Sequence, residues 1–497
     1  MGLHGKTERT AGAEIAGATL LINGKWCEAS DTGHTDVLNP ATGDVLAPIA
    51  VATEKDVAMA VTAAQSGAQA MAALPPHARF AILEAVARRI EAEVDRLAAL
   101  LCAENGKRIE EVTGEVTVAA RIFRGYAEEA KRLFGRAQPL GAIPGRERSL
   151  GITMHVPVGV IAVIVPFNYP VELWSHKIAG GLAAGNAVIT KAPEDCPLAM
   201  IEIARFLEEA GLPDNAHQFL TGGRETGAAL VRQKGLAMIA MTGSTAAGRA
   251  ISEAAASNFT KVHLELGGND ATIVCADADV EEVADALVAG RLTSGNGQIC
   301  VAVKRVLVDA SVAGTLRAAL EKRIGALNVG DPSDPATDVG PLINGRGAEG
   351  VADQIERAIK AGARLICGGT RDDNFIAPTL LAEVTTDNPV FHEEVFGPVL
   401  ALTTFDSFEQ ALDMANDSVY GLQAALFTKD LGRVMQAYKV LDVGTVVVGH
   451  TTAVRVETLP FGGNGQSGNG REGIHDTLTE MTKVKTLLMH EVFPETE

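Results

Sequence analysis

The chain has 497 residues, enough for about two or three domains that each bury a core without disulfide bonds. Its 47% hydrophobic and 21% charged residues exclude a largely disordered or low-complexity protein. The formal net charge of -19 would repel a phosphate backbone and an anionic membrane surface, so neither a nucleic acid nor a membrane is expected as a partner.

The cysteines and the first residues bear on the cellular environment. The six cysteines form no CxxC pair and show no metal-ligand spacing with the histidines, which favours reduced thiols and no metal site. Residues 11–22 contain Glu14 and make a poor secretory segment. No apolar run approaches the roughly 18 residues that cross a membrane. We therefore expect a cytoplasmic protein, with about the first 18 residues as a frayed tail.

In chain order, the first long segment with regular structure is residues 54–131, whose Ala, Leu, Glu and Arg content predicts helices. Residues 159–266 then alternate short apolar runs with amphipathic stretches, as βαβ units do. Three of the runs lack polar alternation, which is typical of parallel strands covered on both faces. This segment predicts a doubly wound, Rossmann-like nucleotide-binding sheet. The expected strands are residues 160–165, 187–190, 218–220, 237–241 and 262–266.

A second α/β series begins near residue 271 and predicts a second domain. It opens with strand 272–275, helix 280–289, strand 301–308 and a helix near 312–325, and further strand and helix pairs follow. The loop 330–341, rich in Asp and Pro, is expected to be a surface connection.

Two stretches fit neither domain. Residues 134–153 are interrupted by Gly and Pro, and residues 480–492 contain a strand-like run at 484–489. Both can pair as edge strands, and exposed edges invite another subunit, so we expect a homodimer or homotetramer. The predicted division is a dinucleotide-binding domain (20–133 and 155–264), a catalytic domain (265–449) and oligomerisation strands (134–154 and 480–497).

Cys300 is the strongest single indication of chemistry. It ends the Gly- and Asn-rich segment 296–300 and directly precedes the predicted strand 301–308. A cysteine at the entrance of a strand can be exposed enough to act as a nucleophile. A lone cysteine is more often a buried small hydrophobic residue, which is the alternative for Cys300 and the interpretation of the other five.

Two further polar residues each have a catalytic and a structural interpretation. Glu265 ends a predicted strand on the same face as His263, where it can act as a general base or be a solvated strand-end carboxylate. Asn168 lies between a strand and a helix that starts near Pro170. It can direct its amide at an oxyanion, although the residues alone favour a helix cap.

The cofactor motifs are weak when taken singly. Gly243 and Ser244 lie in a turn that opens a helix, where backbone N–H groups can receive a pyrophosphate, but an ordinary βα turn explains them nearly as well. Lys191 and Glu194 follow the second predicted strand, where they can hold a ribose or simply be surface charges.

Taken together, the segments resemble the aldehyde dehydrogenase superfamily over residues 20–489. The order and spacing of seven segments make the resemblance specific. They are PFNYP (166–170), AAGNAVITKAPE (183–194), TGST (242–245), LELGG (264–268), GQIC (297–300), EEVFGPV (393–399) and PFGGNGQSGNGREG (460–473).

The resemblance implies an NAD(P)-dependent oxidation of an aldehyde to the carboxylic acid through a thiohemiacetal and a thioester on Cys300. In this scheme Glu265 is the general base, and Asn168 forms the oxyanion hole with the backbone N–H of Cys300. Lys177 and Glu472 resemble the pair that carries a proton away from the base. The LELGG segment argues against the coenzyme-A-acylating branch.

The resemblance also implies a set of cofactor-binding residues. Glu394 and Phe396 look like the pair that positions the nicotinamide ribose and ring. Because Glu194 can accept hydrogen bonds from a ribose 2′-hydroxyl and would repel a 2′-phosphate, NAD is favoured over NADP, with Arg224 as the residue that opposes this preference. The full set is Pro166, Phe167, Lys191, Glu194, Gly223, Gly243, Ser244, Leu266, Glu394 and Phe396.

The aldehyde site is implied by residues that resemble a tunnel wall. Val118 and Ile299 stand where phosphotriose-specific relatives tend to carry arginines, which argues against glyceraldehyde 3-phosphate. The pattern is most similar to the lactaldehyde and semialdehyde branches, and Arg121, Arg124 or Arg455 can meet a substrate carboxylate. The predicted substrate residues are Val118, Tyr169, Glu172, Ile299, Val301 and Arg455, and residues 115–124, His176 and His450 belong to the same wall.

Two other functions remain as alternatives at this point. A cysteine hydrolase or esterase would use Cys300 and Glu265 without a nucleotide, but it would have no need of the turn at Gly243 or of Glu394 and Phe396. A non-catalytic relative that only binds a dinucleotide is disfavoured because Cys300 and Glu265 are both present.

Overall fold

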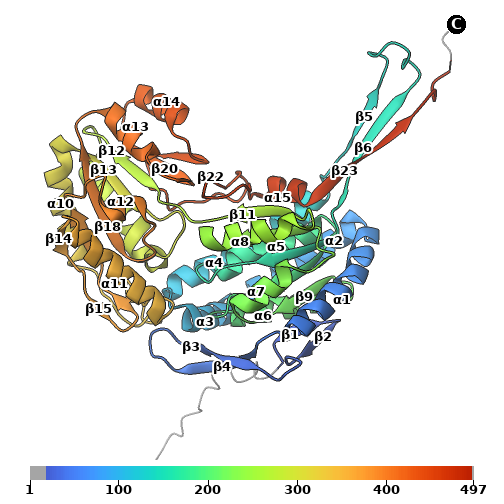
Figure 1. The fold of residues 1–497 in the computed structure, drawn as a ribbon, viewed down its shortest axis with the longest axis horizontal. Coiled ribbons are helices and arrows are strands. Elements are labelled where there is room, and N and C mark those ends of the chain that lie inside the picture. The colour runs from blue at the N-terminus through green and yellow to red at the C-terminus, as the bar shows by residue number, and fades with distance from the viewer. Residues whose placement is uncertain (1–17, 495–497) are drawn as a thin grey trace, which may run out of the picture.

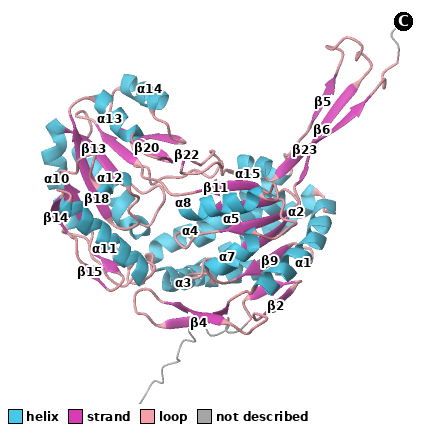
Figure 2. Ribbon diagram, viewed as in Figure 1, coloured by secondary structure: helices cyan, strands magenta, loops and turns pink. Residues whose placement is uncertain are grey.

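The computed structural model describes residues 18–494, in which two seven-stranded sheets lie side by side and a three-stranded arm projects from one of them (Figure 1). Helices pack against both sheets (Figure 2). No helix in this part of the chain is long and apolar enough to cross a membrane. The predicted α/β fold class is confirmed. The frayed tail expected at the N-terminus and the last three residues of the predicted segment 480–497 lie outside the described residues.

The first sheet has the order β11-β10-β7-β8-β9-β1-β2. Five neighbouring strands, from β11 at the edge to β9, are parallel, and their side chains are almost all buried, as expected for strands covered by helices on both faces. The doubly wound prediction is therefore confirmed. The strands are β1 (Leu20–Ile22), β2 (Lys25–Cys27), β7 (Val160–Ile164), β8 (Ala187–Lys191), β9 (His217–Leu220), β10 (Met238–Thr242) and β11 (Lys261–Glu265).

Two groups of helices cover the two faces of this sheet. One face packs against α1 (Glu54–Ala73), α7 (Arg224–Val231) and α8 (Thr245–Ala256). The other face packs against α2 (Pro76–Ala92), α3 (Val94–Asn105), α4 (Ile109–Ala130), α5 (Pro170–Ala183) and α6 (Leu198–Glu209). A hairpin of β3 (His34–Leu38) and β4 (Val45–Ala50) lies beside them.

The second sheet has the order β14-β17-β18-β13-β12-β20-β21 and is mostly parallel. Its strands are β12 (Ala271–Val274), β13 (Arg305–Asp309), β14 (Arg364–Cys367), β17 (Thr379–Ala382), β18 (Val399–Phe405), β20 (Gln423–Phe427) and β21 (Thr445–Val448). Its helices are α9 (Val280–Val288), α10 (Ala310–Ile324), α11 (Gly345–Lys360), α12 (Pro389–His392), α13 (Phe408–Asn416) and α14 (Leu431–Val440). Short strand pairs are β15 (Arg371–Asp372) with β16 (Phe375–Ile376), and β19 (Tyr420–Gly421) with β22 (Asn464–Gly465).

The predicted strand 301–308 is wrong at its start, because β13 begins only at Arg305. The residues before it turn instead of extending: the N–H of Ala302 bonds to the carbonyl of Ile299 at 3.2 Å. The backbone joins the sheet where the N–H groups of Lys304 and Arg305 both reach the carbonyl of Asp270. Cys300 therefore lies in a turn ahead of the strand.

The arm is formed by β5 (Arg136–Pro139), β6 (Leu150–Pro157) and β23 (Thr482–Met489), with β6 in the middle (Figure 1). Both segments predicted as edge strands are therefore strands, and they pair with each other. Before the arm, the chain leaves the second sheet after β21 and returns to the first through residues 449–473 and α15 (Ile474–Glu480). A bridge between Glu265 and Gly468 fixes this returning segment against the end of β11. The predicted domain limits themselves stay a prediction.

Candidate active site

Cys300 is presented by a tightly turned segment between α9 and β13. A π-helical turn (η2, Ala289–Thr293) leads into a 3-10 turn (η3, Ser294–Gly297) in which Asn296 has a left-handed backbone, with φ of 51°. The Asn296 amide group stabilises this backbone by donating to the carbonyls of Gly106 and Pro341 at 2.9 and 3.0 Å. The turn is thereby tied both to the end of α3, which packs on the first sheet, and to the loop between α10 and α11 of the second, which holds Cys300 at the junction of the two sheets.

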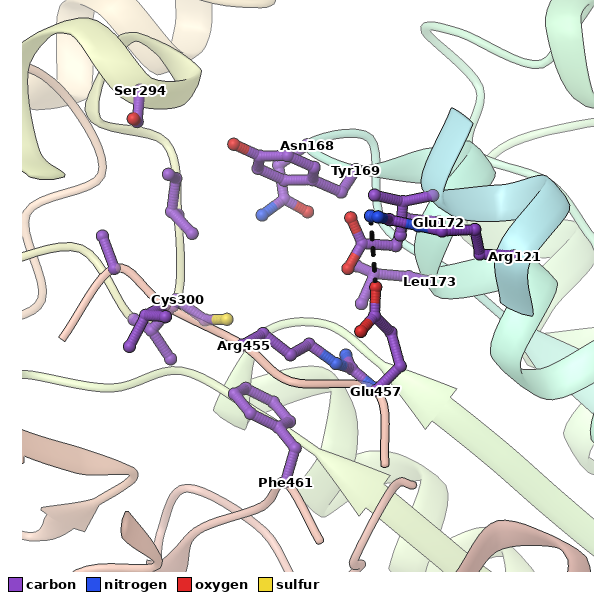
Figure 3. A pocket seen from close by; sticks show the side chains of 15 residues that line it. Arg121, Asn168, Tyr169, Glu172, Leu173, Ser294, Cys300, Arg455, Glu457 and Phe461 are labelled. Atoms are coloured by element: carbon purple, nitrogen blue, oxygen red, sulfur yellow. Dashed lines mark ion pairs between the residues drawn. The ribbon is translucent and has the colours of Figure 1, made fainter. Parts of the chain in front are cut away.

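Cys300 lines a cavity of about 260 Å³. In Figure 3 its sulfur and the Asn168 amide both point into this space. All six predicted substrate residues line it: Val118, Tyr169, Glu172, Ile299, Val301 and Arg455. The structure adds lining residues that were not predicted as substrate residues: Leu173, Ser294, Ala453, Val454, Glu457 and Phe461.

Not all of the basic residues predicted at or near the tunnel wall line the cavity. Arg121 lines the cavity and pairs with Glu457 at 3.5 Å, as the dashed line in Figure 3 marks. Arg124 pairs with Glu84 and Glu91 and does not line the cavity. His176 and His450 are likewise absent from its lining.

The helix-capping interpretation of Asn168 is wrong. The N-cap of α5 is Tyr169, whose side chain makes no capping bond. The first turn is capped instead by the Glu115 carboxylate, which accepts from the N–H groups of Val171 and Glu172 at 2.9 and 3.2 Å. The Asn168 Oδ1 atom is buried without a hydrogen-bond partner. Its amide is therefore not used by the helix and stays directed at the cavity.

Glu265 is buried, so its interpretation as a solvated carboxylate is wrong. Only 2% of the residue is exposed, and neither carboxylate oxygen has a hydrogen-bond partner. Burial, followed by the charge of Glu472, raises the pKa of Glu265 well above its ordinary value. Its Oε1 atom lies 3.8 Å from Nε2 of His263, which shares its strand face as predicted. Glu265 does not itself line the cavity.

Lys177 and Glu472 form a buried ion pair, with Nζ and Oε1 2.6 Å apart. The second oxygen of Glu472 accepts from Nη2 of Arg455 at 2.8 Å. Although burial opposes ionisation, Lys177 and Arg455 hold the pKa of Glu472 far below its ordinary value. The carboxylate of Glu472 is therefore charged and shared between two cations, one of which lines the cavity.

Several predicted cofactor residues gather at the carboxyl ends of the first sheet. Ser244 is the N-cap of α8 and accepts from the N–H of Ala247 at 3.3 Å, so the turn opens a helix as expected. Lys191 ends β8 and is buried, which lowers its pKa to about 8 against the effect of Glu194. Glu194 lies against Gly223, where a Cβ atom would come within 2.7 Å of its Oε2. This sheet edge is where open α/β folds bind nucleotides.

The remaining predicted cofactor residues lie on the segments that follow β7 and β11 and on the segment that precedes β18. Phe167 and Phe396 meet edge to face, with ring centroids 6.0 Å apart. Glu394 accepts from the N–H of Gly268 at 3.1 Å. Leu266 packs against Gly248, since a Cβ atom added to this glycine would lie 2.6 Å from the Leu266 side chain. Pro166 directly precedes Phe167, after the end of β7. The cofactor role of both groups of residues stays a prediction.

Comparison with known proteins shows which family the chain belongs to. Residues 26–487 match the aldehyde dehydrogenase family. The 3-sulfolactaldehyde dehydrogenase of Priestia aryabhattai is 39% identical over 472 residues, which cover 95% of this chain and 98% of the relative.

Solved structures show the same fold. An Escherichia coli NADP-dependent enzyme has a TM-score of 0.93 at 32% identity, covering 97% of this chain and 100% of that one. Betaine aldehyde dehydrogenase from Staphylococcus aureus, solved in complex with NAD+, has a TM-score of 0.92 at 30% identity and covers 96% of each chain. These matches stand against both alternative functions, the nucleotide-free hydrolase and the non-catalytic relative. The chain belongs to the aldehyde dehydrogenase family and is an aldehyde dehydrogenase that uses a nicotinamide cofactor.

Proposed function

We propose that the enzyme oxidises an aldehyde to its carboxylate through a thioester on Cys300. The observation that carries this proposal is the shared cavity, into which both the Cys300 sulfur and the Asn168 amide point. The thiolate adds to the carbonyl carbon, and the Asn168 amide and the Cys300 N–H donate to the oxygen that becomes charged. The nicotinamide cofactor, when bound, accepts the hydride that leaves this carbon. The thioester then remains on Cys300.

Glu265 serves the second half of the reaction. Its carboxylate takes a proton from the water that attacks the thioester, which releases the acid and restores the thiol. Because Glu265 is buried outside the cavity lining, its side chain must turn towards Cys300 for this step. The neighbouring Lys177 and Glu472 pair then receives the proton and passes it on.

The charges of the cavity favour an aldehyde that carries an anionic group. Arg121 and Arg455 both line it, and the Nε atom of Arg455 is buried without a partner. Glu457, which also lines the cavity, pairs with Arg121, and burial raises the pKa of Glu172 to about 7, so Arg455 is the cation best placed to meet the anionic group. The name of the Priestia relative specifies an aldehyde with a sulfo group, which fits such a cavity. The absence of arginine at Val118 and Ile299 still argues against a phosphotriose.

Glu194 supports NAD as the preferred cofactor. It is exposed at the end of β8 beside Gly223, where its carboxylate can accept from the two ribose hydroxyls. A phosphate on the 2′-oxygen would meet this negative charge. NADP is the alternative, and Arg224 at the start of α7 is the cation that would favour it.

The arm supports a homodimer or homotetramer. β23 is an edge strand of the arm, and Val484, Leu487 and Leu488 on it are each at least half exposed. β21 is an edge strand of the second sheet, with Val448 also exposed. Apolar edge strands of this kind are covered when a second copy of the chain packs against them.

Cys300→Ala should abolish reduction of the cofactor. We expect wild-type enzyme with NAD to act best on acid-bearing members of a panel of short, aromatic and acid-bearing aldehydes, followed by the absorbance of reduced nicotinamide. The variant should lose roughly a thousand-fold or more of kcat with every aldehyde, because no other thiol lines the cavity. Cys27→Ala, far from the cavity, is the matched control. Turnover by the alanine variant at the wild-type rate would contradict a thioester on Cys300.

Glu265→Gln should separate the two halves of the reaction. In a rapid-mixing experiment we expect the variant to keep a burst of reduced cofactor, while its steady-state rate falls by roughly a hundred-fold or more. Since burial raises the pKa of Glu265 well above its ordinary value, wild-type deacylation should accelerate as the pH rises through that raised pKa, and the variant should lose this dependence. Glu253→Gln on the exposed face of α8 is the control. Loss of the burst along with the steady state would contradict the assignment.

Cofactor preference should depend on Glu194. Wild-type enzyme is expected to have the higher kcat/KM with NAD, and Glu194→Gln should raise kcat/KM for NADP by about ten-fold, since one charge facing the 2′-phosphate is removed. Arg224→Ala should act in the opposite direction. A clearly higher kcat/KM of the wild type with NADP would show the preference to be wrong.

Sedimentation should show an assembly of two or four chains that the arm holds together. Leu488→Glu places a charge on the exposed face of β23 and should shift the enzyme towards smaller species. Val45→Glu, at a similarly exposed site on β4, should leave the distribution unchanged. A wild-type enzyme that sediments only as a monomer would exclude the proposed role of the arm.

A further inference from the structure

Lys304 occupies a buried position directly behind the nucleophile. It stands four residues after Cys300, at the end of the turn that precedes β13, and only 3% of it is exposed. Its Nζ atom donates to the backbone carbonyl of Ile299 at 3.0 Å and to the carbonyl of Cys300 itself. A third contact reaches Oε1 of Glu394 at 3.1 Å. The three acceptors match the three N–H donors of an ammonium group, so the charge is fully satisfied where it stands.

The contact with Glu394 joins the nucleophile turn to a second segment. Oε1 of Glu394 also accepts from the N–H of Gly268, in the turn that follows β11 and Glu265. The other carboxylate oxygen packs so closely on this turn that a Cβ atom on Gly267 would lie 2.2 Å from it. Glu394 is therefore held between Lys304 and the glycine turn. Through this carboxylate, one ammonium group connects the segments that carry Cys300, Glu394 and Glu265.

The charge of the same ammonium group also acts on the pKa of the Cys300 thiol. Burial is the largest influence on the thiol and raises its pKa to about 12. The charged groups that act on it are Lys304 and Arg455, which lower the pKa, and Glu394 and Asp270, which raise it. Lys304 has the largest effect of the four. Removing its charge would leave two carboxylates facing the sulfur with only Arg455 to oppose them.

We propose that Lys304 is a positioning residue that fixes the Cys300 backbone and the Glu394 carboxylate relative to each other and promotes ionisation of the nucleophile. The proposal rests on the proposed function of Cys300 and Glu394. Lys304 does not touch the aldehyde, since it is absent from the cavity lining. It acts through the two carbonyls and the carboxylate that it binds.

The experiment follows alkylation of Cys300 by iodoacetamide in the full-length enzyme without cofactor, quantified by mass spectrometry of the Cys300 peptide at a series of pH values. Lys304→Met keeps the length of the side chain and removes its charge. The pH profile should move upwards by about one unit, which lowers the rate at a given pH by about ten-fold. Lys304→Arg should restore most of the wild-type rate. Lys261→Met, at an exposed lysine paired with Glu480, is the matched control and should leave the profile unchanged.

Glu394→Gln independently tests the direction in which the pH profile of alkylation moves. Because the carboxylate raises the pKa of the thiol, its removal should move the profile downwards, and the shift should be larger when Lys304 is also replaced by Met. If Lys304→Met does not fold, the single Glu394 variant carries the test. A Lys304→Met profile that coincides with the wild type, or an unchanged profile in Glu394→Gln, overturns the proposal. Alkylation needs neither aldehyde nor cofactor, so the two proposals can fail separately. If only the proposed oxidation is wrong, the enzyme shows no turnover, but the alkylation profiles of the variants still differ from that of the wild type.

Discussion

One buried carboxylate, Glu472, holds the active-site side of the molecule together. It lies on the segment that returns from the second sheet, and it binds Lys177 of α5, on the first sheet, and Arg455 of its own segment. Glu472 and Lys177 are each 1% exposed, so neither charge can be compensated by water. Loss of one partner of such a pair costs about 3–5 kcal/mol because an uncompensated charge stays buried. The same three groups set the charge around Glu265, so the architecture and the electrostatics of the site have a common origin.

The returning segment can close over Glu265 only because it is rich in glycine. A Cβ atom on either Gly462 or Gly470 would lie 2.8 Å from Oε1 of Glu265, closer than two such atoms can approach. The backbone therefore passes directly over the carboxyl group and excludes water from it. This close approach explains both the burial of Glu265 and its raised pKa.

The parts of the fold that the sequence predicted correctly are those encoded locally. Uninterrupted apolar runs identified the central strands of the first sheet, because burial on both faces leaves no polar positions. The errors arose where a distant segment decides the outcome. Asn168 is free for the cavity because Glu115, on α4, caps α5 in its place. Strand 301–308 starts late because the carbonyl of Asp270, from another part of the chain, accepts from the N–H groups of Lys304 and Arg305. Alternation placed His263 and Glu265 on one face, but the cover over them comes from residues far along the chain.

The electrostatics of the site suit two reactive groups that act in turn. Burial raises the pKa values of both Cys300 and Glu265. Lys304 and Arg455 favour the ionised form of Cys300, whereas Lys177, Arg455 and Arg471 favour that of Glu265. Arg455 thus acts on both groups, and two anions beside it would repel each other in a buried site. In the proposed reaction the thiolate is needed first and the carboxylate only after the sulfur has become a neutral thioester. The shared cation can therefore stabilise each anion in its own step.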